Sequence, residues 1–191
     1  MERSAVIFDL DGTLTRPHLD FDAIRAEIGI AAGPILEAME AMTPSDRNRA
    51  ERIVERHEVE AASNSQLYQG TRETLVTLRE RDFPIAILTR NSRSNVDFVL
   101  NKHALVVDAI RTREDGAIKP SPEPVLSICK ELCADPRRSW MVGDFLFDIL
   151  SGKSAGTRTV LMIGDDEPPE YAAQADFVIR RLGELIPLVT V

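Results

Sequence analysis

The chain has 191 residues, 43% of them hydrophobic and 28% charged, with a net charge of −8 and a pI near 5.0. This composition is typical of a globular protein with a full core, and no Lys/Arg cluster supplies the basic face that nucleic-acid binding requires. No apolar run is long enough to span a membrane and the first residues form no secretory signal, so we expect a cytoplasmic protein, monomeric or homodimeric, without nucleic-acid or membrane partners.

Short apolar segments along the chain predict buried β-strands. They carry few charges, as expected for parallel strands that helices cover on both faces. The segments span 4–10, 84–89, 105–110, 139–144, 158–163 and 176–179, and helical patterns lie between most of them, at 71–82, 93–102, 122–134 and 146–155. This alternation predicts an α/β fold with a Rossmann-like, doubly wound parallel sheet.

Residues 16–69 interrupt the alternation, because they contain no strand candidate. Helical patterns cover 21–30, 33–42 and 43–63 instead. In the third helix, Thr43 suits the N-cap position, Pro44 the first helical position and Asp46 the first turn. We therefore expect a small α-helical domain inserted after the first strand.

Two other features predict structure rather than chemistry. Cys129 and Cys133 fall on one apolar helical stripe and lack a second pair of metal ligands, so we expect both to be small core residues. The segment 164–176 predicts a polar loop without a chemical role.

Polar and charged residues follow the first four predicted strands. Because sites in doubly wound sheets form at the carboxyl ends of the strands, we expect these residues to share one rim. Taken singly, Lys119 is better explained as a solvated loop lysine and Asp144 as a helix cap, and the Asp-Gly pair also suits a turn. Their convergence nevertheless favours a single site. The residues are Asp9, Asp11, Gly12 and Thr13 at the first strand, Thr89, Arg90 and Asn91 at the second, Lys119 after the third, and Asp144 and Asp148 after the fourth.

The acidic residues of this set predict a metal ion. Neighbouring carboxylates repel one another, and their pKa values rise unless a cation lies among them. Mg²⁺ resolves this conflict, because it binds carboxylates and also bridges to phosphate oxygens. The Thr89 hydroxyl, the Lys119 ammonium group and free backbone amides at Gly12 and Thr13 are suited to hold the remaining phosphate oxygens.

Four segments resemble, in their expected order, the motifs of the haloacid dehalogenase superfamily, in its phosphoglycolate phosphatase-like branch. They are DLDGTLT, LTRN, KPSPEP and GDFLFDI, and the resemblance covers residues 5 to about 163. It implies a catalytic core at 1–15 and 70–191, a small helical cap at 16–69, and Mg²⁺-dependent hydrolysis of a small phosphorylated metabolite through an aspartyl-phosphate. Asp11 favours phosphate esters over halides, since the dehalogenases of this superfamily lack the second aspartate.

The resemblance also implies a role for each matched residue. Asp9 resembles the nucleophile and Asp11 the general acid/base. Thr89 and Lys119 resemble the groups that bind the transferring phosphoryl group. The implied metal ligands are Asp9, Asp11 through its backbone carbonyl, Asp144 and, directly or as a support, Asp148; the implied phosphate- and substrate-binding residues are Gly12, Thr13, Thr89, Arg90, Asn91 and Lys119.

Phe145, Arg16 and His18 lie close in sequence to the predicted site residues. Phe145 stands where the family often has a small hydroxyl residue, and we expect it to change the packing near the metal. Arg16 and His18 either approach the substrate or lie on the surface of the hinge that leads to the cap.

Two alternatives to a phosphatase are a phosphomutase of the same superfamily, similar to β-phosphoglucomutase, and a catalytically silent binding protein on this scaffold.

Overall fold

The computed structural model describes residues 3–190. The chain folds as two compact units. The larger unit contains the residues up to Pro17 and those from Gln66 onward, and the smaller unit is His18–Ser65.

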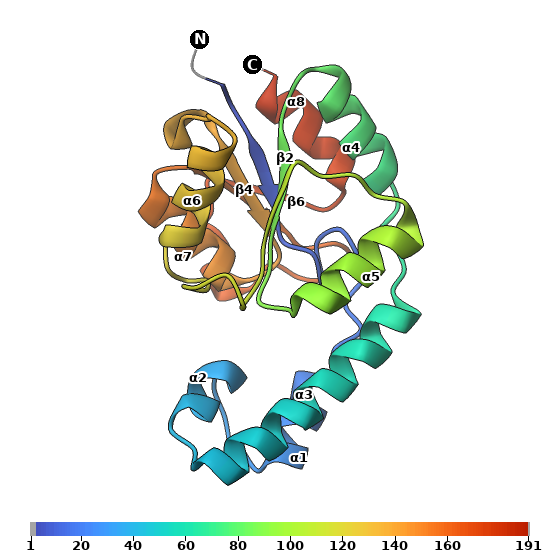
Figure 1. The fold of residues 1–191 in the computed structure, drawn as a ribbon. Helices are drawn as coiled ribbons and strands as arrows, with labels where there is room; N and C mark the ends of the chain where they lie inside the picture. The colour runs from blue at the N-terminus through green and yellow to red at the C-terminus, as the bar shows by residue number, and fades with distance from the viewer. Residues whose placement is uncertain (1–2, 191) are drawn as a thin grey trace. The chain divides into compact units, whose positions relative to one another are not determined.

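A six-stranded, entirely parallel sheet forms the centre of the larger unit (Figure 1). The order across the sheet is β3-β2-β1-β4-β5-β6. The strands are β1 (Val6–Phe8), β2 (Ile85–Leu88), β3 (Ala109–Arg111), β4 (Trp140–Gly143), β5 (Arg158–Met162) and β6 (Phe177–Ile179). The predicted doubly wound α/β fold is therefore confirmed.

Helices cover both faces of this sheet. Figure 1 shows α4 (Thr71–Glu80), α5 (Arg93–His103) and α8 (Leu185–Val189) on one face, and α6 (Glu123–Glu131) and α7 (Leu146–Ala155) on the other. Short 3₁₀ turns lie at Pro136–Arg138, Glu170–Gln174 and Leu182–Glu184. A buried cluster between the sheet and α6 contains Ile7, Leu88, Val125, Ile128 and Met141, so the apolar runs of the sequence supply this core.

The strand order changes direction between β1 and β4. These two strands are hydrogen-bonded neighbours, and Phe8 pairs with Val142 near their carboxyl ends. Within the larger unit, α4 is the first helix after β1 and α7 follows β4, and the two lie on opposite faces of the sheet (Figure 1). In doubly wound sheets, ligand sites form at this change of direction. Asp9 and Asp144 follow the two strands and thus emerge side by side at this point.

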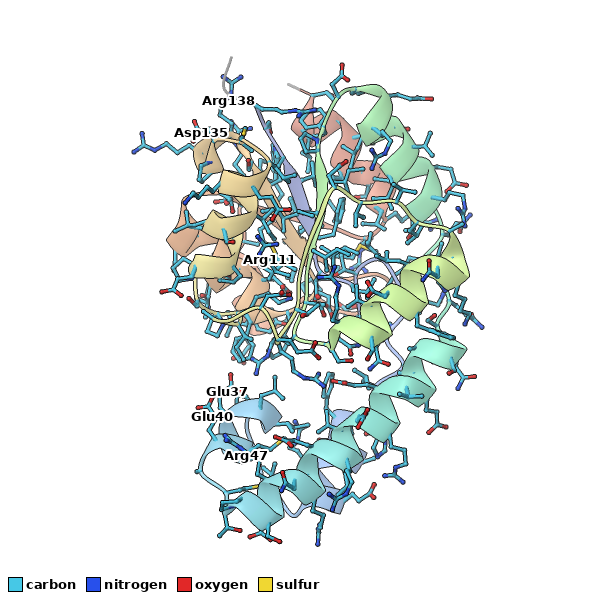
Figure 2. All side chains as sticks on the ribbon, in the orientation of Figure 1. Glu37, Glu40, Arg47, Arg111, Asp135 and Arg138 are labelled. Atoms are coloured by element: carbon cyan, nitrogen blue, oxygen red, sulfur yellow. The ribbon has the colours of Figure 1, made fainter. Side chains whose placement is uncertain are left out.

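The smaller unit is helical, with α1 (Phe21–Ile28), α2 (Ile35–Glu40) and α3 (Pro44–Asn64) around its own apolar cluster. The predicted start of α3 is confirmed, because the Asp46 backbone N–H donates to Thr43 Oγ1 at 3.3 Å. Arg47 Nε donates to the Met39 carbonyl at 3.2 Å, and Figure 2 shows Arg47 beside α2. Among residues 3–190, no helix combines the length and the apolar character needed to cross a bilayer.

Several predicted elements were too long, among them the third strand and the helix before the fourth strand. The third strand begins at Ala109 rather than at 105, because Asp108 turns its side chain back and its Oδ2 accepts the Ile85 N–H at 2.8 Å. The helix predicted at 122–134 ends at Glu131, and Cys133 lies beyond it with a left-handed φ of 52°. Cys129 is buried as predicted, whereas the prediction for Cys133 was wrong, since this residue is exposed.

Candidate active site

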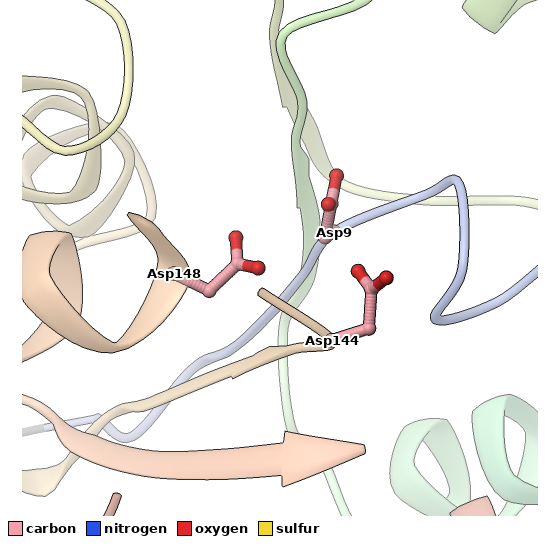
Figure 3. A group of neighbouring side chains, drawn as sticks. All are labelled: Asp9, Asp144 and Asp148. Carbon is pink, nitrogen blue, oxygen red and sulfur yellow. The ribbon is translucent and has the colours of Figure 1, made fainter. Parts of the chain in front are cut away.

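Three aspartates converge at the carboxyl ends of β1 and β4 (Figure 3). Asp9 directly follows β1, Asp144 directly follows β4, and Asp148 lies in the first turn of α7. One carboxylate oxygen from each residue lies within 4.8 Å of the others. Oxygen ligands at this separation can share one divalent cation.

Glycines make room for two of these carboxylates. A Cβ atom at Gly12 would lie 2.2 Å from Asp144 Oδ2, and a Cβ atom at Gly143 would lie 2.1 Å from Asp148 Cγ. Gly12 also has φ +85°, a left-handed conformation that glycine adopts without strain. Both positions therefore require glycine for the cluster to form.

Lys119 provides the positive charge that faces this cluster. Its Nζ lies 2.6 Å from Asp148 Oδ1 and 3.0 Å from Asp9 Oδ1, and its side chain is buried. Burial alone would lower the pKa of Lys119, but the charges of Asp148 and Asp9 outweigh it and raise this pKa to about 12. Lys119 is therefore a permanent cation that orients both carboxylates.

One lysine does not neutralise three carboxylates. Burial raises the pKa of Asp144 well above its usual range, and the charges of Asp9 and Asp148 raise it further. Burial also raises the pKa of Asp148, although Lys119 opposes this shift. A compact set of hard oxygen donors with excess negative charge is the environment that Mg²⁺ prefers, so these residues fit the ion that the sequence predicts.

Thr89, Asp11 and Asn91 form a second hydrogen-bonded group, in the segments that follow β1 and β2. Thr89 is buried, and its Oγ1 accepts the Asn91 backbone N–H at 3.1 Å, which leaves the hydroxyl hydrogen available to a ligand. Asn91 Nδ2 donates to Asp11 Oδ2 at 2.9 Å. The structure thus brings the predicted acid/base and the predicted phosphoryl-binding hydroxyl to the same rim.

The turn after β1 differs from the prediction. The Gly12 N–H donates to the Thr15 carbonyl at 2.9 Å, and the Thr13 N–H donates to the Leu10 carbonyl at 3.4 Å. These bonds close the turn, so the prediction that both amides are free to bind phosphate was wrong. Thr13 instead contributes its hydroxyl, which donates to Asp144 Oδ1 at 3.3 Å.

Aromatic side chains line the edge near α7. Phe145 packs edge-to-face with Phe147 and Tyr171, at centroid distances of 5.1 and 5.8 Å. The Arg90 guanidinium lies 4.8 Å from the centre of the Phe147 ring, and its Nη1 donates to the Lys119 carbonyl at 3.3 Å. Arg90 is therefore held at the rim by a ring and a backbone carbonyl.

Known proteins share both this sequence pattern and this fold. Residues 4–156 match the haloacid dehalogenase-like hydrolases, which is most of the chain. The chain belongs to this family of hydrolases. The family predicted from the four motifs is therefore confirmed.

Individual relatives support the assignment. A haloacid dehalogenase-like hydrolase domain-containing protein of Arabidopsis thaliana is 31% identical, with 94% of this chain and 81% of that protein aligned. The N-acetylmuramic acid 6-phosphate phosphatase of Pseudomonas putida is 30% identical over 83% of this chain and 82% of its own length. The crystal structure of a hydrolase from Pseudomonas syringae shares the fold, with a TM-score of 0.81 at 21% identity and 97% of each chain covered.

Sequence reasoning missed a cavity that Asp144 helps to line. It has a volume of about 200 Å³, and its lining includes Gly12, Tyr68, Asp144, Asp166 and Tyr171. The loop at 164–176, predicted to have no chemical role, supplies part of this lining. The same rule that selected the ends of the first four strands, applied to the strand at 158–163, would have pointed to this loop.

The two residues at the entry to the helical insertion lie in different units. Arg16 belongs to the larger unit, where its guanidinium lies 5.4 Å from the centre of the Tyr68 ring. Tyr68 also lines the cavity, so Arg16 contacts a residue of the cavity wall. His18 belongs to the smaller unit.

Proposed function

We propose that this protein is a Mg²⁺-dependent phosphatase that hydrolyses a small phosphorylated metabolite through an aspartyl-phosphate on Asp9. The observation that carries the proposal is the convergence of Asp9, Asp144, Asp148 and Lys119 within hydrogen-bonding or metal-binding distance. A family relative is named as an N-acetylmuramic acid 6-phosphate phosphatase, which supports a phosphorylated substrate.

In the first step of this mechanism, a carboxylate oxygen of Asp9 attacks phosphorus and the bond to the ester oxygen breaks. Asp11 donates its proton to that oxygen, so the leaving group departs as an alcohol and Asp9 carries the phosphoryl group. Lys119 and the Thr89 hydroxyl donate to the phosphoryl oxygens, on which negative charge is concentrated.

In the second step, water attacks the aspartyl-phosphate and gives a proton to Asp11. The bond between phosphorus and the Asp9 oxygen breaks, which releases inorganic phosphate and restores both carboxyl groups to their starting states. Bound Mg²⁺ would offset charge on the phosphoryl oxygens and orient the group for in-line attack. Asp9, the Asp11 carbonyl, Asp144 and Asp148 would hold it or support its ligands.

We also propose that the helical unit His18–Ser65 acts as the cap that selects the leaving group. This unit has its own hydrophobic cluster, so its amino-acid sequence can change without disturbing the packing of the sheet. Substitution of His18 tests this role through the KM for the natural ester, which should change while hydrolysis of p-nitrophenyl phosphate is retained.

The direct test is release of p-nitrophenol from p-nitrophenyl phosphate in the presence of Mg²⁺, with Asp9→Asn as the variant. We expect the variant to be inactive, because the amide is a poor nucleophile toward phosphorus. Activity equal to that of the wild type would contradict the assignment of Asp9. A screen of phosphorylated metabolites then identifies the substrate, and an isomerised product without free phosphate would indicate a mutase instead.

A further inference from the structure

The side-chain amide of Asn91 has only one orientation in this structure. Its Oδ1 accepts two hydrogen bonds, from the Ser92 backbone N–H at 2.7 Å and from Asn95 Nδ2 at 3.2 Å. A backbone N–H can only donate, so the atom facing Ser92 must be the carbonyl oxygen of the amide. The NH₂ group of Asn91 consequently points the other way.

That NH₂ group reaches the predicted acid/base. Asn91 Nδ2 donates to Asp11 Oδ2 at 2.9 Å, across 80 residues of sequence. The backbone of Asn91 is fixed as well, since its N–H donates to Thr89 Oγ1 at 3.1 Å. Asn91 and Asn95 are both buried, so neither amide turns freely.

We propose that Asn91 is a positioning residue that aims Asp11 at the leaving oxygen, rather than a group that binds phosphate. This role rests on the proposed phosphatase function. The hydrogen bond from Asn91 Nδ2 to Asp11 Oδ2 restricts rotation of the Asp11 carboxyl group about its side chain. Asn91 thereby determines the direction in which the Asp11 carboxyl group points.

The chemistry that depends on this arrangement is departure of the leaving group. As the phosphorus–oxygen bond breaks and the phosphoryl group moves to Asp9, the electron pair stays on the ester oxygen, which takes the proton from the Asp11 carboxyl group. An alkoxide or simple phenoxide needs that proton, whereas p-nitrophenoxide is stable enough to leave without it. A misplaced Asp11 should therefore slow hydrolysis of poor leaving groups selectively.

Phenyl phosphate and p-nitrophenyl phosphate test this selectivity, because they differ by one substituent. The quantity to compare is kcat/KM, which includes leaving-group departure and excludes the later hydrolysis of the aspartyl-phosphate. For Asn91→Ala we expect kcat/KM to fall by about a hundredfold on phenyl phosphate and by less than about threefold on p-nitrophenyl phosphate. The inhibition constant for inorganic phosphate should stay at the wild-type value.

Two further variants separate positioning from folding. Asn91→Asp keeps an oxygen acceptor for Ser92 and Asn95 but replaces the donor to Asp11 by a carboxylate oxygen that repels it, so it should show the same selective loss or a larger one. Asn101→Ala changes an exposed residue of α5, the helix that begins two residues after Asn91, and should leave both rates unchanged. In an Asp11→Asn background, Asn91→Ala should have no further effect on phenyl phosphate.

The outcomes distinguish the possible failures. An equal loss of kcat/KM on both esters, together with a weaker inhibition by inorganic phosphate, would show that Asn91 binds phosphate and would overturn the positioning role. A further loss in the Asp11→Asn background would overturn it too. Wild-type protein that hydrolyses neither ester would overturn the proposed phosphatase function, and with it this role of Asn91.

Discussion

Lys119 Nζ lies 2.6 Å from Asp148 Oδ1, and both side chains are almost completely buried. Removing one partner of such a pair leaves an uncompensated charge in the interior, which typically costs about 3–5 kcal/mol. We therefore expect Lys119→Met to lower the free energy of unfolding by about 3 kcal/mol at neutral pH, as measured by urea denaturation in the presence of a chelator.

A second Lys–Asp pair provides the control for this prediction. Lys153 Nζ lies 2.8 Å from Asp176 Oδ1, but these side chains are 44% and 37% exposed. Solvent screens exposed pairs, so Lys153→Met should cost less than about 1 kcal/mol. Similar losses in the two lysine variants would show that the burial of Lys119 does not determine its contribution.

Gly12→Ala should disable the carboxylate cluster. The added Cβ would lie 2.2 Å from Asp144 Oδ2, in a residue whose φ is +85°. Gly156 has the same φ, but a Cβ atom added there would meet nothing within 4 Å. The control variant Gly156→Ala therefore introduces only the backbone strain, about 1–2 kcal/mol, without the steric conflict. Both variants should lose stability, but only Gly12→Ala should weaken Mg²⁺ binding, by more than about tenfold in a calorimetric titration.

Mg²⁺ should stabilise the folded protein as well as activate it. A ligand that binds only the folded state adds about 2.7 kcal/mol at a concentration 100 times its Kd. Thermal unfolding should therefore shift upward with added Mg²⁺ and return to its starting point with a chelator. Asp144→Asn should remove the shift, whereas Asp97→Asn on the surface of α5 should retain it. A shift that survives in Asp144→Asn would place the ion elsewhere.

Asp176 should make the free energy of unfolding depend on pH in the acidic range. Burial raises the pKa of Asp176, but hydrogen bonds from Lys153 and Thr159 outweigh it and hold the pKa below its ordinary value of 3.8. A carboxyl group with a lowered folded-state pKa stabilises the protein above its unfolded-state pKa, and this contribution is lost as the pH falls through the folded-state value.

The variant Asp176→Ala tests the direction of this pH dependence. Its deficit in unfolding free energy should be largest near neutral pH and should shrink as the pH is lowered from about 4. The exposed acid Glu80 gives a comparison, and Glu80→Ala should show little deficit at any of these pH values. A deficit for Asp176→Ala that stays constant down to about pH 2 would show that its carboxylate charge is not what stabilises this loop.

The sequence by itself determined the sheet and the rim that it presents. Runs such as Val6–Phe8 and Ile85–Leu88 are apolar on both faces, which is possible only for strands covered on both sides, and polar residues directly after such strands must lie at one edge. Thr43 and Pro44 marked the start of α3 correctly, because cap chemistry depends on adjacent residues. These are local properties, and local patterns are sufficient to predict them.

Only the tertiary structure decided how the rim residues meet. Asn91 and Asp11 are 80 positions apart, and nothing in either motif shows that an amide held by Ser92 and Asn95 donates to that carboxyl group. The hydrogen bond from the Gly12 amide to the Thr15 carbonyl could not be predicted either, because it depends on the position of that carbonyl in the folded turn. Such contacts are determined by the relative placement of distant backbone segments, which follows from packing of the whole sheet and its helices rather than from any short stretch of sequence.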